Sequence, residues 1–387
     1  MKRVLTIFFI TILLHNGHVE AQNDTGMSGQ AIGSGVLNPG VPFLSLTPDA
    51  RGSSLGESGA ATDPDVYSLY WNNAKLVFIE HKMGGTLSYT PWLNKIANDM
   101  FISYVAGYLK IDDKQAIGLS LRYFNLGEFQ INDGLGTFIA ELNPYEVAVD
   151  ATYSRKLTDH LSLGISGRFI NSNISRQFAL LEDIGAGYSV AIDLGVYYKK
   201  SITLAGNNAD LSLGAHLSNF GTKINYGNNG NGDFIPTNLR MGTALRNYLD
   251  ENNSLTFVFD INKLMIPTPP VYGRDESGNR EIIDGKDPNR SLFSGTFGSF
   301  GDAPGGLSEE LKELTFSTGL EYWYKSAFAV RAGYFHENRY KGDRQYLTFG
   351  LGFRYQVFGF DTSYLAPLSK NHPLAETLRF SVLFNFN

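Results

Sequence analysis

The sequence contains no cysteine among its 387 residues. This excludes a disulfide framework, a thiolate metal site, a cysteine nucleophile and a lipidated N-terminal cysteine. Positive charge is also scarce, since 32 Lys and Arg residues stand against 38 Asp and Glu residues, for a net charge of −6. A nucleic-acid-binding protein needs a basic face that neutralises phosphates, so we expect no nucleic acid among the partners.

Long apolar runs are missing after the first 14 residues. No later segment reaches even half of the roughly 20 apolar residues that a membrane-spanning helix requires. The chain is rich instead in glycine and aromatic residues, with 42 Gly, 21 Tyr and 27 Phe at 43% hydrophobic and 18% charged residues. This composition is too apolar for a disordered chain. It is typical of a β-barrel with an apolar outside and a polar inside.

The first residues have the pattern of an export signal. Lys2 and Arg3 precede an apolar run over residues 4–14, and Ala21 follows a short polar stretch. This pattern predicts a signal peptide over residues 1–21, cleaved after Ala21. The apolar run is too short for a membrane anchor.

Apolar residues recur at every second position from about Thr86 onward, and helical periodicity is nearly absent. The segments are about ten residues long, whereas the strands of soluble sandwiches are typically about 5–6 residues. No repeat of propeller length is present. The sequence therefore predicts an all-β fold: a closed antiparallel transmembrane β-barrel of about 14 strands over residues 76–387, with residues 22–75 as an N-terminal plug.

The connections between these segments alternate in length. Short periplasmic turns and longer outer loops are typical of outer-membrane barrels, so the alternation places both chain ends in the periplasm. One turn, over residues 199–209, is longer than expected. The predicted short turns are residues 112–114, 156–160, 247–253, 325–326 and 356–357, and the long segments are 127–145, 171–188, 219–237, 266–313, 338–344 and 367–376.

Charged residues within the segments share the inward phase. A lipid-facing Arg or Lys at mid-bilayer costs roughly 2–4 kcal/mol, so an inward position is favoured. Their signs mostly alternate from strand to strand, which predicts a polar, filled lumen rather than an open pore. These residues are Arg122, Asp150, Arg168, Asp193, Arg240, Asp260, Glu321, Arg331, Arg354, Asp361 and Arg379.

No arrangement of residues indicates catalysis, a metal or a cofactor. Residues 52–56 spell G-x-S-x-G, but without the strand and helix that a nucleophile elbow requires. His216 and Ser218 have a spacing like that of outer-membrane phospholipases, but their phase turns them inward. The other histidines have no metal-ligand spacing, and residues 227–233 lack the regular carboxylates of a calcium loop. We therefore expect a protein that is not an enzyme.

The long segment 266–313 carries three aromatic residues, Phe293, Phe297 and Phe300, on the expected cell exterior. A structureless run of this length is usually functional or disordered. Exposed aromatic residues indicate a protein-binding surface. The alternative is that they fold back over the mouth of the barrel.

Two sets of motifs carry a family resemblance. Pro48-Asp49-Ala50-Arg51-Gly52 and Tyr70-Trp71-Asn72-Asn73-Ala74 resemble the N-terminal hatch of FadL-like barrels. Within that superfamily, Pro42-Phe43-Leu44, Ala61-Thr62-Asp63-Pro64-Asp65 and Ser88-Tyr89-Thr90-Pro91-Trp92-Leu93 resemble the PorV (LptO) family of the type IX secretion system. The resemblance is specific over residues 41–125. Asn73 and Leu55 depart from the Pro and Met of the superfamily, and Asn387 replaces a final aromatic.

The resemblance implies an integral outer-membrane protein, surrounded by membrane lipid, that shuttles secreted cargo. It would bind the C-terminal signal domain of cargo at the large translocon barrel and deliver the cargo to the surface sortase-like attachment complex. The alternative is a FadL-like transporter of hydrophobic small molecules. The name LptO also implies lipid A deacylation, but no Ser/His/acid arrangement faces lipid.

Site residues follow from the same motifs. We expect Arg51 to anchor the plug by pairing with Asp150, Asp193 or Asp361, with Asn72 as a further anchor. Thr90 is expected to cap a short helix with Pro91 in its first position. The expected partner-binding residues are Trp92, Leu93 and Ile96 at the outer rim, and Phe293, Phe297 and Phe300 in the long segment.

Overall fold

The computed structural model describes residues 35–387, apart from residues 94–98, 133–134, 175–184, 228–231 and 369–376. Residues 35–387 form one compact unit. The predicted signal peptide lies outside the described residues, as does the first part of the predicted plug.

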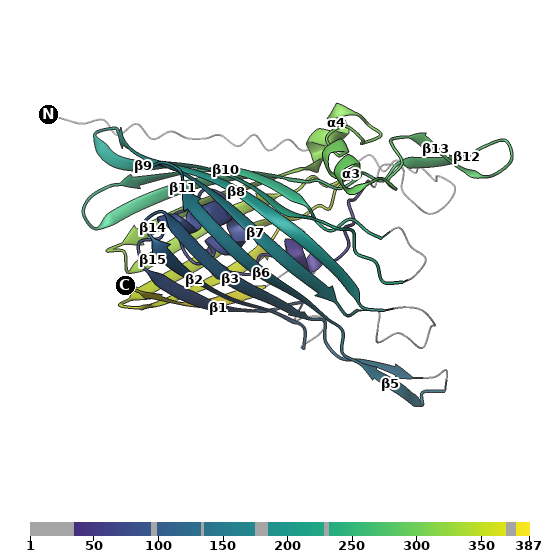
Figure 1. Cartoon of the computed structure of the whole chain (residues 1–387), viewed down its shortest axis with the longest axis horizontal. Coiled ribbons are helices and arrows are strands. Elements are labelled where there is room, and N and C mark those ends of the chain that lie inside the picture. The colour runs from purple at the N-terminus through teal and green to yellow at the C-terminus, as the bar shows by residue number, and fades with distance from the viewer. Residues whose placement is uncertain (1–34, 94–98, 133–134, 175–184, 228–231, 369–376) are drawn as a thin grey trace. The chain divides into compact units, whose positions relative to one another are not determined.

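Fourteen strands of the described chain close into one antiparallel barrel (Figure 1). Each strand pairs with its neighbour in sequence order, and the first strand pairs with the last to close the wall. The predicted fold class is thus confirmed in its strand number and its closure. The wall consists of β1 (Met83–Pro91), β2 (Phe101–Asp112), β3 (Gln115–Asn125), β6 (Tyr145–Lys156), β7 (Leu161–Ser172), β8 (Gly187–Leu204), β9 (Asn207–Gly221), β10 (Asn238–Tyr248), β11 (Asn253–Leu264), β14 (Leu314–Tyr324), β15 (Phe328–His336), β16 (Gln345–Tyr355), β17 (Phe358–Pro367) and β18 (Leu378–Phe386).

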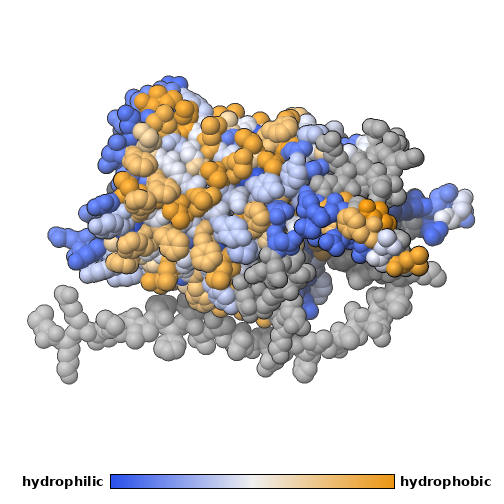
Figure 2. All heavy atoms as spheres, turned by 90° about the horizontal axis from the view of Figure 1, so that it is seen from below, coloured by the Kyte–Doolittle hydropathy of each residue, from blue (hydrophilic) through white to orange (hydrophobic). Residues whose placement is uncertain are grey.

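Burial alternates along most of the wall strands as the sequence pattern predicts. On β7, Leu163 and Phe169 are exposed on the outside, whereas Ser166 and Arg168 are buried inside. Apolar side chains spread over the middle of the wall and hydrophilic residues gather toward its ends (Figure 2). None of the described helices is long and apolar enough to cross a membrane.

The short connections lie at one end of the barrel, which we call the turn end. The prediction of a long turn over residues 199–209 is wrong, because β8 runs to Leu204 and β9 begins at Asn207. Only Ala205 and Gly206 connect them, with φ angles of 51° and 88°. Two successive positive φ angles match the right-handed twist of a hairpin, so the strands extend as far as the turn permits.

The long connections lie at the opposite end, which we call the loop end (Figure 1). One of them contains a hairpin of β4 (Phe129–Asn132) and β5 (Phe138–Leu142). The expectation that segment 266–313 lacks structure is wrong. It contains the hairpin of β12 (Val271–Arg274) and β13 (Arg280–Asp284), followed by the helices α3 (Leu292–Gly298), α4 (Leu307–Glu310) and η4 (Leu311–Glu313). We call residues 266–313 the loop-end assembly.

Residues 41–79, which we call the lumenal segment, lie inside the barrel (Figure 1). Their short helices are η1 (Pro42–Ser45), α1 (Ala50–Ser54), α2 (Ser68–Trp71) and η2 (Asn73–Phe78). The side chain of Asp49 caps α1 by accepting a hydrogen bond from the backbone nitrogen of Gly52. α1 packs against the inner faces of β16, β17 and β18, and η2 packs against β6, β7 and β8.

Candidate functional site

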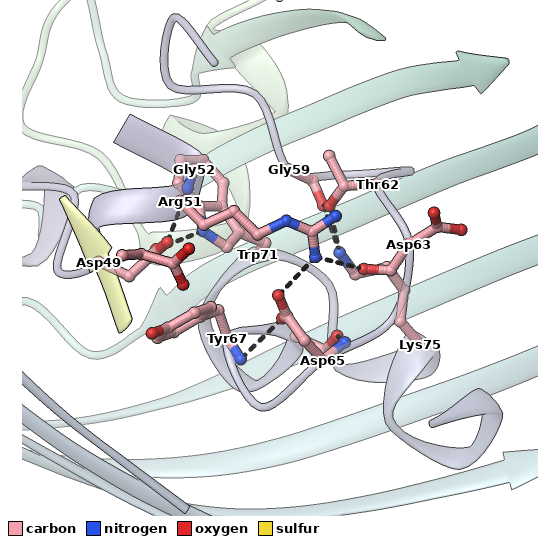
Figure 3. A network of polar contacts seen from close by, with 12 residues as sticks. Asp49, Arg51, Gly52, Gly59, Thr62, Asp63, Asp65, Tyr67, Trp71 and Lys75 are labelled. Carbon is pink, nitrogen blue, oxygen red and sulfur yellow. Dashed lines mark hydrogen bonds and ion pairs between the residues drawn. The ribbon is translucent and has the colours of Figure 1, made fainter. Parts of the chain in front are cut away.

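Arg51 joins the lumenal segment to the barrel wall. Its Nε and Nη2 atoms donate to the two carboxylate oxygens of Glu321 on β14, at 3.0 and 2.8 Å. Its Nη1 atom donates to the Asp65 carboxylate at 2.6 Å and to the backbone oxygen of Asp63 at 3.0 Å (Figure 3). All three nitrogens of the guanidinium are therefore bonded, which compensates for its burial.

A second polar network holds the lumenal segment to itself. The Asp49 carboxylate accepts from the Trp71 ring nitrogen at 2.6 Å as well as from Gly52 at 2.7 Å (Figure 3). Lys75 donates to the backbone oxygen of Gly59 and to the hydroxyl of Thr62, at 2.7 and 2.9 Å. These contacts fold a segment with little regular structure into one shape.

The predicted partners of Arg51 are wrong. Asp150 and Asp193 instead pair with Arg168 on β7. Asp361 pairs with Arg331 and Arg354, both at 2.8 Å. Neighbouring strands bring these opposite charges together. Glu321 is also paired in this way, with Arg331 at 2.6 Å, so Arg51 shares its wall carboxylate with an arginine of β15.

Asn72, the other predicted anchor, belongs to the lumenal segment and contacts β8. Its side-chain nitrogen donates to the backbone oxygens of Ala60 and Val196, at 2.9 and 3.0 Å. Its side-chain oxygen accepts from the backbone nitrogen of Ala74. A single amide thus bridges two parts of the lumenal segment and the wall.

A capped helix is expected to begin at Thr90 and Pro91. For residues 90–93, which the structure describes, this expectation is wrong. Thr90 and Pro91 belong to β1, where they pair with Ile102 and Phe101. Trp92 is buried, with 7% of its surface exposed, in an apolar cluster that includes Phe43 and the partly buried Leu93. Trp92 therefore packs in the same apolar cluster as the lumenal segment and does not expose a surface to a partner. Ile96 lies outside the described residues.

The three aromatic residues of the loop-end assembly lie on its surface. Phe293, Phe297 and Phe300 are 66%, 53% and 50% exposed. The rings of Phe293 and Phe297 contact Phe220 at the end of β9, with centroids 5.3 and 5.9 Å apart. They are held in place by this contact while keeping at least half of their surface open.

A charge cluster that the sequence analysis missed fixes the loop-end assembly to the wall. Lys263, at the end of β11, donates to Glu310 at 2.9 Å and to Glu313 at 2.7 Å. Lys341 donates to Glu313 at 3.0 Å and to Glu309 at 2.6 Å. The only signal in the sequence was the set of three Glu residues over residues 309–313, because both lysines lie far from them along the chain.

A cavity of about 340 Å³ with mixed polar and apolar lining lies at the loop end, between the lumenal segment and the ends of β9 to β11, β14 and β15; we call it the loop-end cavity. Arg240 is among its lining residues, with its guanidinium 4.5 Å from the Trp71 ring centre. Its Nε atom donates to the side-chain oxygen of Asn262 at 2.8 Å. Further polar lining comes from Ser218, Asn219, Asn238, Thr315 and Glu337.

Among the described residues, no group of three or more histidine, aspartate and glutamate side chains could hold a metal ion. His216 is buried on the inner face, so it does not form a lipid-facing pair with Ser218. Ser218 instead lines the loop-end cavity.

The closed barrel, its apolar outer wall and its polar lumen define an integral outer-membrane β-barrel protein. A model of the family described as "Type IX secretion system protein PorV" matches residues 30–271, more than half of the chain. The chain therefore belongs to the PorV family of the type IX secretion system. By the topology of such barrels, the turn end faces the periplasm and the loop end faces the cell exterior.

Solved structures with a similar fold are FadL-like outer-membrane barrels. The toluene transporter TbuX of Ralstonia pickettii is 10% identical, with a TM-score of 0.47, covering 89% of this chain and 99% of that one. The toluene transporter TodX of Pseudomonas putida is 12% identical, with a TM-score of 0.45 and coverages of 87% and 96%. A FadL homologue of Pseudomonas aeruginosa is 11% identical, with a TM-score of 0.44 and coverages of 88% and 99%. No curated protein matches the sequence.

Proposed function

We propose that this protein receives type IX cargo at the outer face of the membrane and carries it from the large translocon barrel to the sortase-like attachment complex. It recognises the C-terminal signal domain of the cargo. The observation that carries the proposal is the loop-end assembly, an ordered exterior surface with half-exposed aromatic residues. Aromatic residues are enriched at the centres of protein interfaces.

The charge cluster under this surface supports a binding role. Lys263 and Lys341 together hold three glutamates, so the surface above them is ordered before a partner arrives. Preorganisation lowers the entropy lost on binding. Next to this surface, the loop-end cavity offers polar groups such as Arg240 to the end of an incoming chain.

The alternative function, transport of hydrophobic small molecules, requires an apolar pocket and a route through the barrel. The loop-end cavity is not wholly apolar, because Arg240, Asn238 and Asn262 line it together with leucines and Phe335. Below it the lumenal segment is bonded to the wall through Arg51 and Glu321. These features favour the cargo-binding proposal, which involves no catalytic group.

The test is affinity purification from gently solubilised outer membranes, with co-purifying proteins identified by mass spectrometry. We expect a very large barrel translocon, or secreted proteins with intact C-terminal signal domains. Recovery of the barrel alone, with a fatty acid or another hydrophobic ligand inside, would support the transporter.

A surface variant makes this test specific. Phe293→Ser together with Phe297→Ser removes both half-exposed rings, and we expect recovery of cargo to fall at least several-fold. The matched control is Phe138→Ser, because Phe138 is 58% exposed on the other loop-end hairpin. Equal recovery of cargo by the wild type, the Phe293→Ser/Phe297→Ser variant and the Phe138→Ser variant would remove this surface from the proposal.

A further inference from the structure

The lipid-facing wall contains an apolar hollow of about 630 Å³, which we call the wall groove. It lies over β1, β2, β3 and β6, near the turn end. This volume is within the roughly 300–1,000 Å³ of ordinary ligand sites. Its lining residues include Met83, Gly107, Leu109, Ile117, Leu119, Ala151 and Phe386.

Strand register explains why the wall is hollow here. Gly85 pairs with Gly107, Gly107 pairs with Leu119, and Leu119 pairs with Ala151. One row of outward-facing positions therefore holds four small residues, since Gly167 pairs with Ala151, and Leu119 is the single large residue among them. The rows on either side are filled by large apolar residues: Phe386, Met83, Leu109, Ile117 and Tyr153 toward the turn end, and Leu87, Val105, Leu121 and Val149 toward the loop end.

The turn end of the wall groove carries positive charge and a polar belt. Arg155 pairs with Gln115, one row beyond Tyr153, and Tyr153 donates a hydrogen bond to the Gln115 side chain at 2.7 Å. Within the part of the chain that the structure describes, the Arg155 side chain has no hydrogen bond or ion pair. It is exposed, as are Lys82 and Lys114 at the same end. The nearby Asp112 carboxylate is already bonded to the Lys114 backbone and the Gln115 side chain.

The spacing between groove and charge suits one class of molecule. Arg155 lies four residues beyond Ala151 on the same face of β6, which is about 13 Å along a strand. An acyl chain spans such a distance and leaves its phosphate beside the guanidinium. Arginine and phosphate form paired, charge-assisted hydrogen bonds.

We infer that the wall groove binds one phospholipid of the periplasmic leaflet, with an acyl chain over Gly107 and Ala151 and the phosphate at Arg155. A partner barrel would need a broad complementary face, since stable interfaces bury more than about 1,000 Å². The groove is a single hollow between two filled rows, which matches the shape of a chain.

The test is native mass spectrometry of the full protein after reconstitution in vesicles of phosphatidylethanolamine with a minority of phosphatidylglycerol and extraction in mild detergent. We expect one retained phospholipid on the wild-type protein. Gly107→Leu fills the floor of the groove, and the space at Gly107 accepts a side chain, because a Cβ atom at this position would lie 3.5 Å from its nearest neighbour. We expect this variant to lose the lipid.

Ala332→Leu is the matched control, because Ala332 faces outward on β15, on a part of the wall that does not line the groove. This variant should keep the lipid. Arg155→Gln should reduce retention roughly tenfold, as expected for the loss of hydrogen bonds to a charged group. Heat-dependent mobility on gels verifies that each barrel is folded, and Ala151→Leu replaces Gly107→Leu if that variant does not fold.

Equal lipid retention by the wild type and the folded groove variants would overturn the inference. A photocrosslinker at position 107 that captures a protein in native membranes, with no lipid retained, would overturn it as well.

Discussion

Arg51 is one of the residues that hold the lumenal segment in the barrel. It spans Glu321 on the wall and Asp65 on the segment itself. In Arg51→Gln, Glu321 keeps its pair with Arg331 but loses its hydrogen bonds from Arg51, and the partly exposed Asp65 loses its ion pair. Hydrogen bonds to charged groups contribute about 1.5–3 kcal/mol, so we expect a loss of stability of that size. We expect a lower unfolding temperature by circular dichroism and faster proteolysis of residues 41–79.

Arg354→Gln provides the control for Arg51→Gln. Arg354 also pairs with a lumen carboxylate that Arg331 shares, but its side chain is 21% exposed and its hydrogen bonds go to wall residues rather than to the lumenal segment. The expected loss is therefore smaller. Equal losses in the two variants would show that Arg51 has no special anchoring role.

Gly214 marks the closest approach between wall and lumenal segment. A Cβ atom at this position of β9 would lie 2.0 Å from the backbone oxygen of Ala60. Gly214→Ala should therefore destabilise the protein by about 1–3 kcal/mol, the usual cost of overpacking. Gly167→Ala, where no atom lies within 4 Å, should be nearly neutral. Chemical denaturation of both variants measures the difference, and a neutral Gly214→Ala would contradict this packing.

The loop-end assembly is the element whose stability depends most clearly on pH. Burial acts to raise the pKa of Glu310, but hydrogen bonds from Ala303 and Lys263 outweigh it and lower the pKa below its usual 4.5. Burial also acts to raise the pKa of Glu309, but hydrogen bonds from Lys341 and from the Gly305 backbone outweigh it and lower the pKa. A lowered pKa means that the stabilisation is present above the usual value and is lost as the pH falls through the folded value.

We therefore expect residues 266–313 to be protected from hydrogen exchange at neutral pH and to lose that protection below about pH 4.5, before the barrel strands do. Glu310→Gln should reduce the protection at neutral pH and weaken its dependence on pH. Protection that is the same in both proteins at every pH would exclude Glu310 as its source.

Elements differ in how well the sequence predicts them. The wall strands, and the inward phase of residues such as Arg168 and Asp361, follow from a period of two that local geometry imposes. The helices of the loop-end assembly do not, because contacts with the distant Lys263 and Lys341 hold them. The pairing of Arg51 with Glu321 could not be predicted either, because it depends on where the lumenal segment places Arg51 inside the barrel. Glu321 is already paired with Arg331 of the neighbouring strand.

For the whole molecule, the filled lumen has an electrical consequence. We expect the intact protein to conduct no ions in planar bilayers, because residues 41–79 occupy the interior and are bonded to the wall. A variant without residues 41–79 should form ion-conducting pores if its wall still closes. Sustained conductance of the intact protein at the level of the variant would contradict a closed lumen and favour the transporter.

The pairing of β1 with β18 also sets an order of events during assembly. Met83 pairs with Phe386, so the wall cannot close until the last strand is in place. The lumenal segment is synthesised before any strand, yet α1 is bonded to that same last strand: the backbone nitrogen of Ala50 donates to Ser381, and Arg379 donates to Ser53. Contacts across more than 300 residues form late in folding, because the intervening chain must first be ordered. The pairing of β18 with β1 is therefore the step that both closes the barrel and completes the hydrogen bonds between α1 and the wall.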